Sequence, residues 1–150
     1  MDDALERMRL AAALWSVEGD DAAELVDAAC ALLVAGHDGD NVAILAGVMR
    51  KDAEEEAPAL LEAALRDVGL EHYAPDAHEA QRIAVRHLAS QAIAGELVPA
   101  DFLWRAIGSS SDFADRLFVL GREYLSDHRR ATQLIDADVL AEAHRLLDRR

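Results

Sequence analysis

The sequence predicts an all-α protein, and three observations support this fold class. Hydrophobic residues make up 52% of the 150-residue chain, and most of them are Ala and Leu, which favour helices. Aromatic residues make up only 5%, and runs of β-branched residues, which strands favour, are scarce. Glycine, proline and acidic residues punctuate the chain at intervals of about one helix. We therefore expect one domain, residues 1–150, of about six to eight packed helices in a bundle or a short array of αα-hairpins.

The N-terminal quarter of the chain predicts two helices joined by a short turn. The first is expected over Asp3–Val17, because apolar residues recur on one face and Gly19 follows its end. The second is expected to begin at Asp21-Ala-Ala-Glu24, which has the pattern of a capping box, and to end before Gly36. Its apolar stripe comprises Leu25, Val26, Ala29, Cys30 and Leu33. On this face the Cys30 thiol is expected to be buried and inert.

Two more helices are expected before residue 70. Asp40 is placed to cap a helix over 41–49, because its carboxylate can accept hydrogen bonds from the free N–H groups of the first turn. The next helix is expected to begin a few residues before Pro58, since proline is tolerated only in the first turn. Gly69 is expected to end it.

The second half of the chain predicts four helices. A capping-box pattern opens the first of these, which is expected over 76–94. A short helix over 99–108 follows, and residues 109–112 are expected to cap another that runs through Tyr124. The last helix is expected to begin near Asp136. Short connections between these elements are typical of a helical bundle.

The net charge of −14 is unevenly distributed along the chain. Residues 1–75 contain 17 acidic and 5 basic side chains, whereas residues 76–150 contain 12 and 10. A concentration of one sign attracts an oppositely charged partner, although acidic residues also serve solubility alone. Because most of the acids lie near predicted helix starts, we expect several to share one rim of the domain and to bind a basic protein. The candidate partner-binding residues are Asp20, Asp21, Glu24, Asp38, Asp40, Asp52, Glu54, Glu55 and Glu56.

His37-Asp38 is the pairing that most suggests a metal or acid–base site. It resembles the histidine–aspartate dyad of HD-type phosphohydrolases, but it lies in a connector rather than on a helix, which favours a turn. His78-Glu79 lacks the second histidine that a zinc-protease helix needs, because position 82 is arginine. We therefore predict no metal, no cofactor and no catalytic residue. A metal-dependent hydrolase using His37 and Asp38 is the alternative.

Composition disfavours several other classes of partner. A nucleic-acid-binding protein normally presents a basic face, which the net charge opposes. The longest uncharged runs are far shorter than the roughly 18 apolar residues that a membrane span needs, and the acidic start is unlike a signal peptide. A single cysteine excludes an internal disulfide. We therefore expect a cytoplasmic protein that binds neither nucleic acid nor membrane.

The C-terminal part, from Ala94-Gly-Glu-Leu-Val-Pro99 to the segment Ile135–Leu147, resembles a loose group of small, mostly uncharacterised helical proteins from high-GC bacteria. The predominance of arginine over lysine and the abundant alanine fit that background. The resemblance implies an all-α fold and no particular activity. Small acidic helical proteins of this kind are also similar in character to immunity proteins, which neutralise toxins made by the same cell.

These observations leave three functions open. The preferred prediction is a non-enzymatic acidic helical binding protein, an inhibitor or immunity protein that neutralises a basic partner such as a toxin or nuclease. The first alternative is the metal-dependent hydrolase. The second is a helical scaffold or homodimer whose charge is only solubilising.

Overall fold

The structure, a computed structural model, describes residues 2–75, 77–109, 115–125 and 132–148. These residues form eight α-helices and one 3-10 helix and contain no strand, which confirms the all-α prediction. Contacts divide the chain into two compact units, residues 1–80 and 81–150, called unit 1 and unit 2. The single domain over 1–150 stays a prediction.

Unit 1 contains the helices predicted for the first half of the chain. They are α1 (Asp3–Glu18), α2 (Ala22–Val34), α3 (Asp40–Ala46), η1 (Arg50–Asp52) and α4 (Ala53–Asp67). The glycines predicted to follow three of them, Gly19, Gly36 and Gly69, all have positive φ. Helix α3 ends three residues earlier than predicted, because the weak helix former Gly47 follows it and the chain continues into η1.

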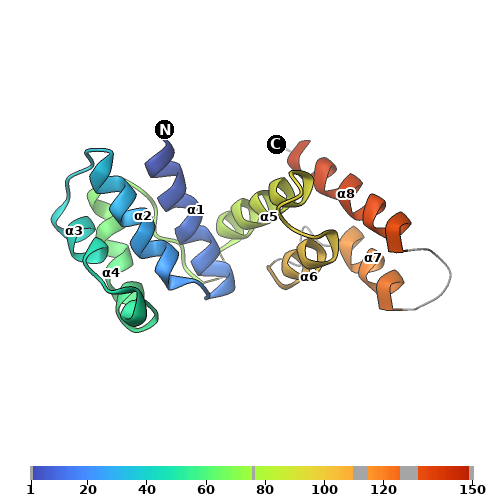
Figure 1. Cartoon of the computed structure of the whole chain (residues 1–150), viewed down its shortest axis with the longest axis horizontal. Coiled ribbons are helices and arrows are strands. Elements are labelled where there is room, and N and C mark those ends of the chain that lie inside the picture. Colours follow the sequence, from blue (N-terminus) through green and yellow to red (C-terminus); the bar gives the residue numbers. More distant parts are fainter. Residues whose placement is uncertain (1, 76, 110–114, 126–131, 149–150) are drawn as a thin grey trace. The chain divides into compact units, whose positions relative to one another are not determined.

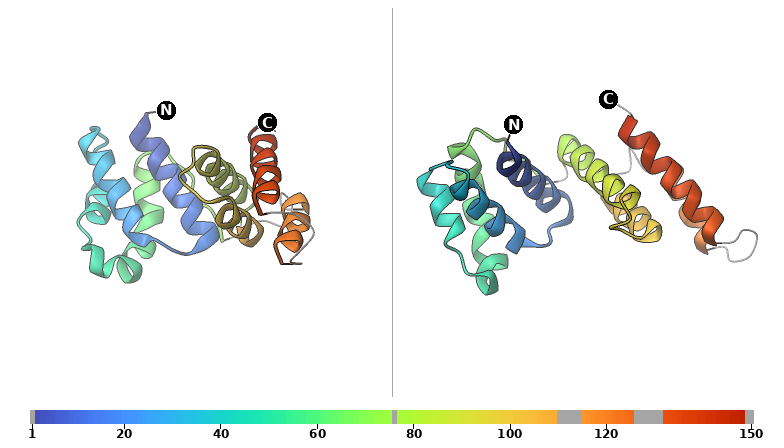
Figure 2. Two further views of the ribbon diagram at one scale, coloured as in Figure 1. Left: turned by 45° about the vertical axis from the view of Figure 1, so that its right-hand side comes forward. Right: turned by 45° about the horizontal axis from the view of Figure 1, so that its top comes forward.

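The helices of unit 1 alternate in direction (Figures 1 and 2). His37, just after α2, lies 2.5 Å from the carboxylate of Asp2, just before α1, so these two helices run antiparallel. The Cys30 thiol on α2 lies 3.5 Å from the Ala46 carbonyl at the end of α3, so α3 runs back along α2. Helix α2 packs against α1, α3 and α4, and α3 also packs against α4. Unit 1 therefore has two ends. The starts of α1 and α3 lie at one end, and the starts of α2 and α4 lie at the other.

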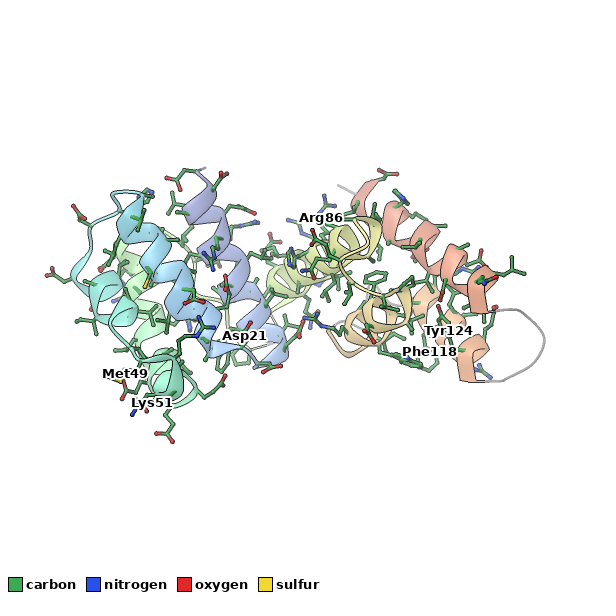
Figure 3. The ribbon with its side chains drawn as sticks, in the orientation of Figure 1. Asp21, Met49, Lys51, Arg86, Phe118 and Tyr124 are labelled. Atoms are coloured by element: carbon green, nitrogen blue, oxygen red, sulfur yellow. The ribbon has the colours of Figure 1, made fainter. Side chains whose placement is uncertain are left out.

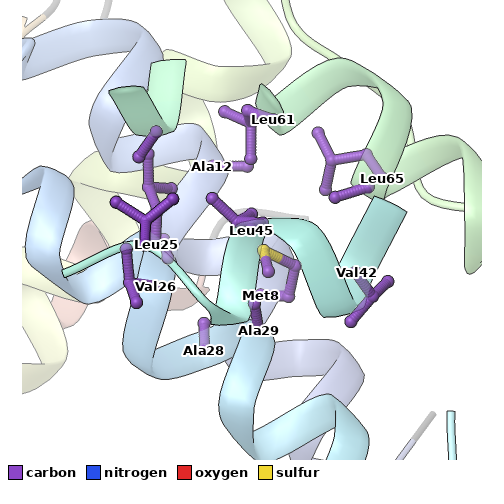
Figure 4. Packing of buried hydrophobic residues seen from close by; sticks show 14 of the residues in the cluster. Met8, Ala12, Leu25, Val26, Ala28, Ala29, Val42, Leu45, Leu61 and Leu65 are labelled. Carbon is purple, nitrogen blue, oxygen red and sulfur yellow. The ribbon is translucent and has the colours of Figure 1, made fainter. Parts of the chain in front are cut away.

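The core of unit 1 is built from small and branched aliphatic side chains (Figure 4). Its largest fully buried members are Met8, Leu25, Leu32, Val42, Leu45, Leu61 and Leu65. Alanines fill the positions between them, and eight alanines of this cluster are also buried: Ala11, Ala12, Ala22, Ala28, Ala29, Ala53, Ala57 and Ala64. Because alanine is small, the helix axes can approach closely, and the core needs no aromatic residue at its centre.

Helix α3 is capped by a residue of α4 and not by Asp40. The Asp67 carboxylate accepts hydrogen bonds from the backbone N–H groups of Asn41 (2.8 Å) and Val42 (3.3 Å) and from the Asn41 side chain (3.1 Å). Asp40 is the first residue of the helix, and its side chain makes no capping bond. Gly39 makes the approach possible, because a Cβ at this position would lie 2.6 Å from an Asp67 oxygen. The prediction of Asp40 as the cap is wrong, since the first turn of α3 faces α4.

Unit 2 contains the remaining helices. They are α5 (His78–Ile93, whose first turn lies at the boundary with unit 1), α6 (Pro99–Ser109), α7 (Asp115–Leu125) and α8 (Thr132–Asp148). Its core is formed by Val85, Leu88, Ala89, Ala92, Phe102, Leu103, Ala106, Leu117, Leu120, Ile135, Val139, Ala143 and Leu146. Helices α6, α7 and α8 pack against one another.

Two polar contacts join helices across unit 2 (Figure 3). The Tyr124 hydroxyl on α7 donates to the carboxylate of Asp136 on α8. Arg86 on α5 donates to the carbonyl oxygens of Leu146 (3.3 Å) and Leu147 (3.0 Å) near the end of α8, where a cation is favourable. This arginine therefore has a role in the fold.

The start of α8 and the exposure of Cys30 differ from the predictions. Helix α8 begins at Thr132 and not near Asp136, since Ile135 is already buried in the core of unit 2. The Cys30 thiol is exposed, because the buried face of α2 is centred on residues 25, 29 and 32 and position 30 lies to one side. The predicted caps at Asp76 and within 110–112 lie outside the described residues.

The Asp67 cap should make unit 1 sensitive to acid. Hydrogen bonds from the Asn41 side chain and backbone hold the pKa of Asp67 below its usual value. A depressed folded-state pKa contributes stability that is present above the unfolded value and is lost as the pH falls through the folded value. We expect Asp67→Asn to lower the melting temperature at pH 7 and to flatten its decline below pH 4, measured by circular dichroism. The exposed control Glu71→Gln should change neither quantity, and equal behaviour of the two variants would contradict the cap.

The stability that the Tyr124–Asp136 bond contributes should be lost at alkaline pH. Burial first, and then the bond to Asp136 and its charge, raise the pKa of the Tyr124 phenol. The stability from this group is therefore complete below about pH 10 and is lost as the pH rises further. We expect Tyr124→Phe to cost about 1 kcal/mol at pH 7 and to retain more of its stability than the wild type between pH 9 and 11. Urea titrations at these pH values would show it, and parallel curves would overturn it.

Candidate functional site

Six of the nine candidate acids lie together at one end of unit 1. Helices α2 and α4 both begin there, and a hydrogen bond of 3.1 Å between the Ala22 backbone N–H and the Glu54 carboxylate joins the two starts. We call this surface the acidic end, and it consists of Asp20, Asp21, Asp52, Glu54, Glu55 and Glu56. Asp52 is half-buried and the other five residues are exposed.

The start of α2 is shaped by a left-handed residue. Asp21 has φ 60° and ψ 53°, and its side chain makes no capping bond, so the predicted capping box is wrong. Aspartate tolerates this conformation better than most residues. The Ala22 N–H donates to the Glu54 carboxylate and not to Asp21. Because Ala22 is fully buried, the carboxylate from α4 satisfies a donor that solvent reaches poorly.

Carboxylates at the acidic end are not neutralised by basic side chains. In unit 1, Arg7 pairs with Glu24 (2.7 Å), Arg9 with Glu6 (3.1 Å), Arg50 with Asp27 (2.6 Å) and Arg66 with Glu62 (3.3 Å). All of these pairs involve acids outside the acidic end. No ion pair joins a residue of the acidic end to any other residue that the structure describes. The negative charge of the end is therefore directed at solvent.

An apolar side chain and a lysine accompany these carboxylates. Met49 has 63% of its surface exposed, and Lys51 is exposed on the adjoining 3-10 helix. Figure 3 shows both residues and Asp21 at the same end of unit 1. A flexible methionine adapts to varied apolar surfaces of a partner. Sequence reasoning missed Met49 because it placed this residue inside a helix that ends at Ala46.

The other three candidate acids lie elsewhere. Glu24 is on the flank of α2, where Arg7 binds it through two hydrogen bonds of 2.7 and 3.0 Å. Asp38 and Asp40 are exposed at the opposite end of the unit, beside the start of α3. The alternating directions of the helices cause this separation, because they place the start of α3 away from the starts of α2 and α4.

His37 pairs with Asp2, the residue that caps α1. Its ring lies 2.5 Å from an Asp2 oxygen, while the other oxygen accepts the Leu5 N–H (2.9 Å) and caps α1. The Leu5 bond first, and then the histidine, hold the pKa of Asp2 below its usual value. Within the described part of the chain, no group of three His, Cys, Asp or Glu residues could hold a metal ion. The bonds at Asp2 join His37, just after α2, to the cap of α1.

Comparisons with known proteins give no relative to set beside this surface. No family model, curated protein or solved structure matches the chain. Among the residues that the structure describes, no helix is both long enough and apolar enough to cross a membrane.

The two neighbouring glutamates at the start of α4 should differ in their contribution to stability. Both meet the positive end of the α4 dipole, but only Glu54 caps the Ala22 N–H. We expect Glu54→Ala to lower the free energy of unfolding by about 1 kcal/mol more than Glu55→Ala. Chemical denaturation of both variants measures the difference. If the two variants are equally stable, Glu54 acts only through the dipole.

Proposed function

We propose that this protein is a non-enzymatic binding protein that presents the acidic end of unit 1 to a basic protein partner, as an inhibitor or immunity protein does toward a toxin or nuclease. The observation that carries the proposal is the absence of ion pairs from the acidic end among the described residues, beside basic side chains that pair with acids elsewhere. We place this activity in the cytoplasm, where an exposed single thiol such as Cys30 stays reduced.

Carboxylates without ion-pair partners on one surface favour association with a basic protein through electrostatic attraction. Their summed field raises the local concentration of a basic partner and speeds its encounter, and salt screens the effect. Exposed Met49 beside them offers an apolar contact that salt does not weaken. A surface whose acids served only solubility would have no need of such a concentration at one end.

The acidic end favours neither alternative function. His37, proposed for the hydrolase, is engaged by Asp2. The homodimer alternative does not use the acidic end, since two copies of this surface would repel each other. The acidic end therefore favours a partner of opposite charge.

Salt-dependent association tests the proposal. The chain would be used to capture partners from a lysate of its own source cell, and association rates of the purified partner would be measured over a range of salt. Replacing Asp20, Asp21, Glu55 and Glu56 with their amides keeps the Glu54 cap. We expect this variant to associate about tenfold or more slowly than the wild type at low salt, with the difference fading at high salt.

A second variant controls for net charge. Amides at Asp3, Asp38, Asp40 and Glu71 remove the same charge from exposed positions outside the acidic end. We expect this control to associate at nearly the rate of the wild type. The proposal fails if both variants slow association equally, or if no captured partner shows salt-dependent association.

A further inference from the structure

The outer face of α7 carries two exposed apolar residues between opposite charges. Phe118 and Val119 have 57% and 48% of their surfaces exposed, although the opposite face of the same helix is buried in the core of unit 2. Asp115 and Arg122, also exposed, flank them. The spacing i, i+3, i+4, i+7 places these four residues on one side of the helix. We call them the α7 face.

An aromatic side chain from α6 extends this apolar surface. Trp104 is 43% exposed, and the tip of its indole ring lies against Gly121, where a Cβ would come within 3.2 Å of it. Phe118, labelled in Figure 3, precedes Gly121 by about one helical turn, so the two positions are neighbours on the surface of α7. The Trp104 indole at Gly121 therefore extends the apolar surface that begins at Phe118. Exposed Trp and Phe side chains on packed helices are typical anchors of protein interfaces.

The order of residues on the α7 face is complementary to its own inverted copy. A twofold axis midway between Phe118 and Val119 places a second copy of α7 antiparallel to the first. Asp115 of each chain then lies opposite Arg122 of the partner subunit, so two charge pairs form. The same operation places Phe118 against the partner subunit's Val119 at the centre. Contacts related in this way define an isologous dimer interface. A parallel pairing would instead place like charges opposite each other.

We propose that the α7 face is a homodimer interface in which α7 of one chain packs antiparallel against α7 of a second copy, with Trp104 at its margin. Neither Asp115 nor Arg122 forms an ion pair with another residue that the structure describes, so both charges are available to the second copy. Residues 76–150 carry nearly balanced charge, 12 acidic and 10 basic side chains, so two copies meet here without the repulsion that residues 1–75 would cause.

Charge placement within α7 has a second explanation, which the experiment must separate from dimerisation. An acid at the start and a base at the end of a helix also complement the dipole of that helix. Exchanging the two residues reverses this local effect and makes it unfavourable. The same exchange keeps every pair across the twofold axis attractive, because the signs are reversed on both copies.

Sedimentation equilibrium of the full chain measures the proposed dimer. We expect the wild type to dimerise in a concentration-dependent manner. Asp115→Arg and Arg122→Asp, made singly, should each raise the dimer Kd about tenfold or more, because each places like charges opposite each other twice. The double variant D115R/R122D should restore most of the affinity. Arg116→Asp, on the same helix but outside the α7 face, should leave the Kd unchanged.

Removal of the apolar centre gives an independent measurement. Phe118→Ala should weaken the dimer, whereas Val98→Ala, an equally exposed apolar position outside the α7 face, should not. Circular dichroism would establish that each variant is folded. A wild type that is monomeric throughout its soluble concentration range would overturn the proposal. So would a dimer that neither the single charge reversals nor Phe118→Ala weakens.

Discussion

The carboxylates that α4 supplies to other helices are the contacts on which the arrangement of unit 1 depends. Glu54, in the first turn of α4, caps the start of α2, and Asp67, at its end, caps the start of α3. Each bond satisfies backbone donors that a helix start leaves free. Because these caps lie at opposite ends of one helix, they fix where α2 and α3 begin relative to it. The hydrophobic core alone would tolerate small sliding movements of such alanine-rich helices.

Sequence reasoning identified the helices better than it identified their caps. Left-handed glycines such as Gly36 and Gly69 are local signals, so helix ends were predicted to within a few residues. Capping rules also consider only residues within about four positions, and they therefore assigned Asp21 and Asp40 roles that Glu54 and Asp67 have. Gly39, which admits Asp67, looked like an ordinary connector glycine. Only the packing of α4 shows why residue 39 is glycine, since a side chain there would collide with Asp67.

The charge pattern was visible in the sequence, but its position in space required the helix directions. A count of residues showed that the first half is acidic. It did not show that Asp38 lies at the end opposite Asp20, or that Glu24 is neutralised by Arg7. The α7 face was hidden for a similar reason, since Phe118 reads as one more apolar residue until Leu117 and Leu120 are seen to fill the core. The proposed surfaces thus differ in their interactions: the acidic end acts through long-range charge, and the α7 face through short-range apolar contact flanked by charge pairs.

The caps from α4 also impose an order on folding during synthesis. Glu54 lies 32 positions beyond the N–H that it caps, and Asp67 lies 26 positions beyond Asn41. A nascent chain that has emerged only as far as α3 therefore lacks the acceptors for both helix starts. Closing these long loops costs chain entropy, which is recovered only when α4 docks. We therefore expect unit 1 to gain its stability in one late step on the ribosome, after residue 67 has left the exit tunnel.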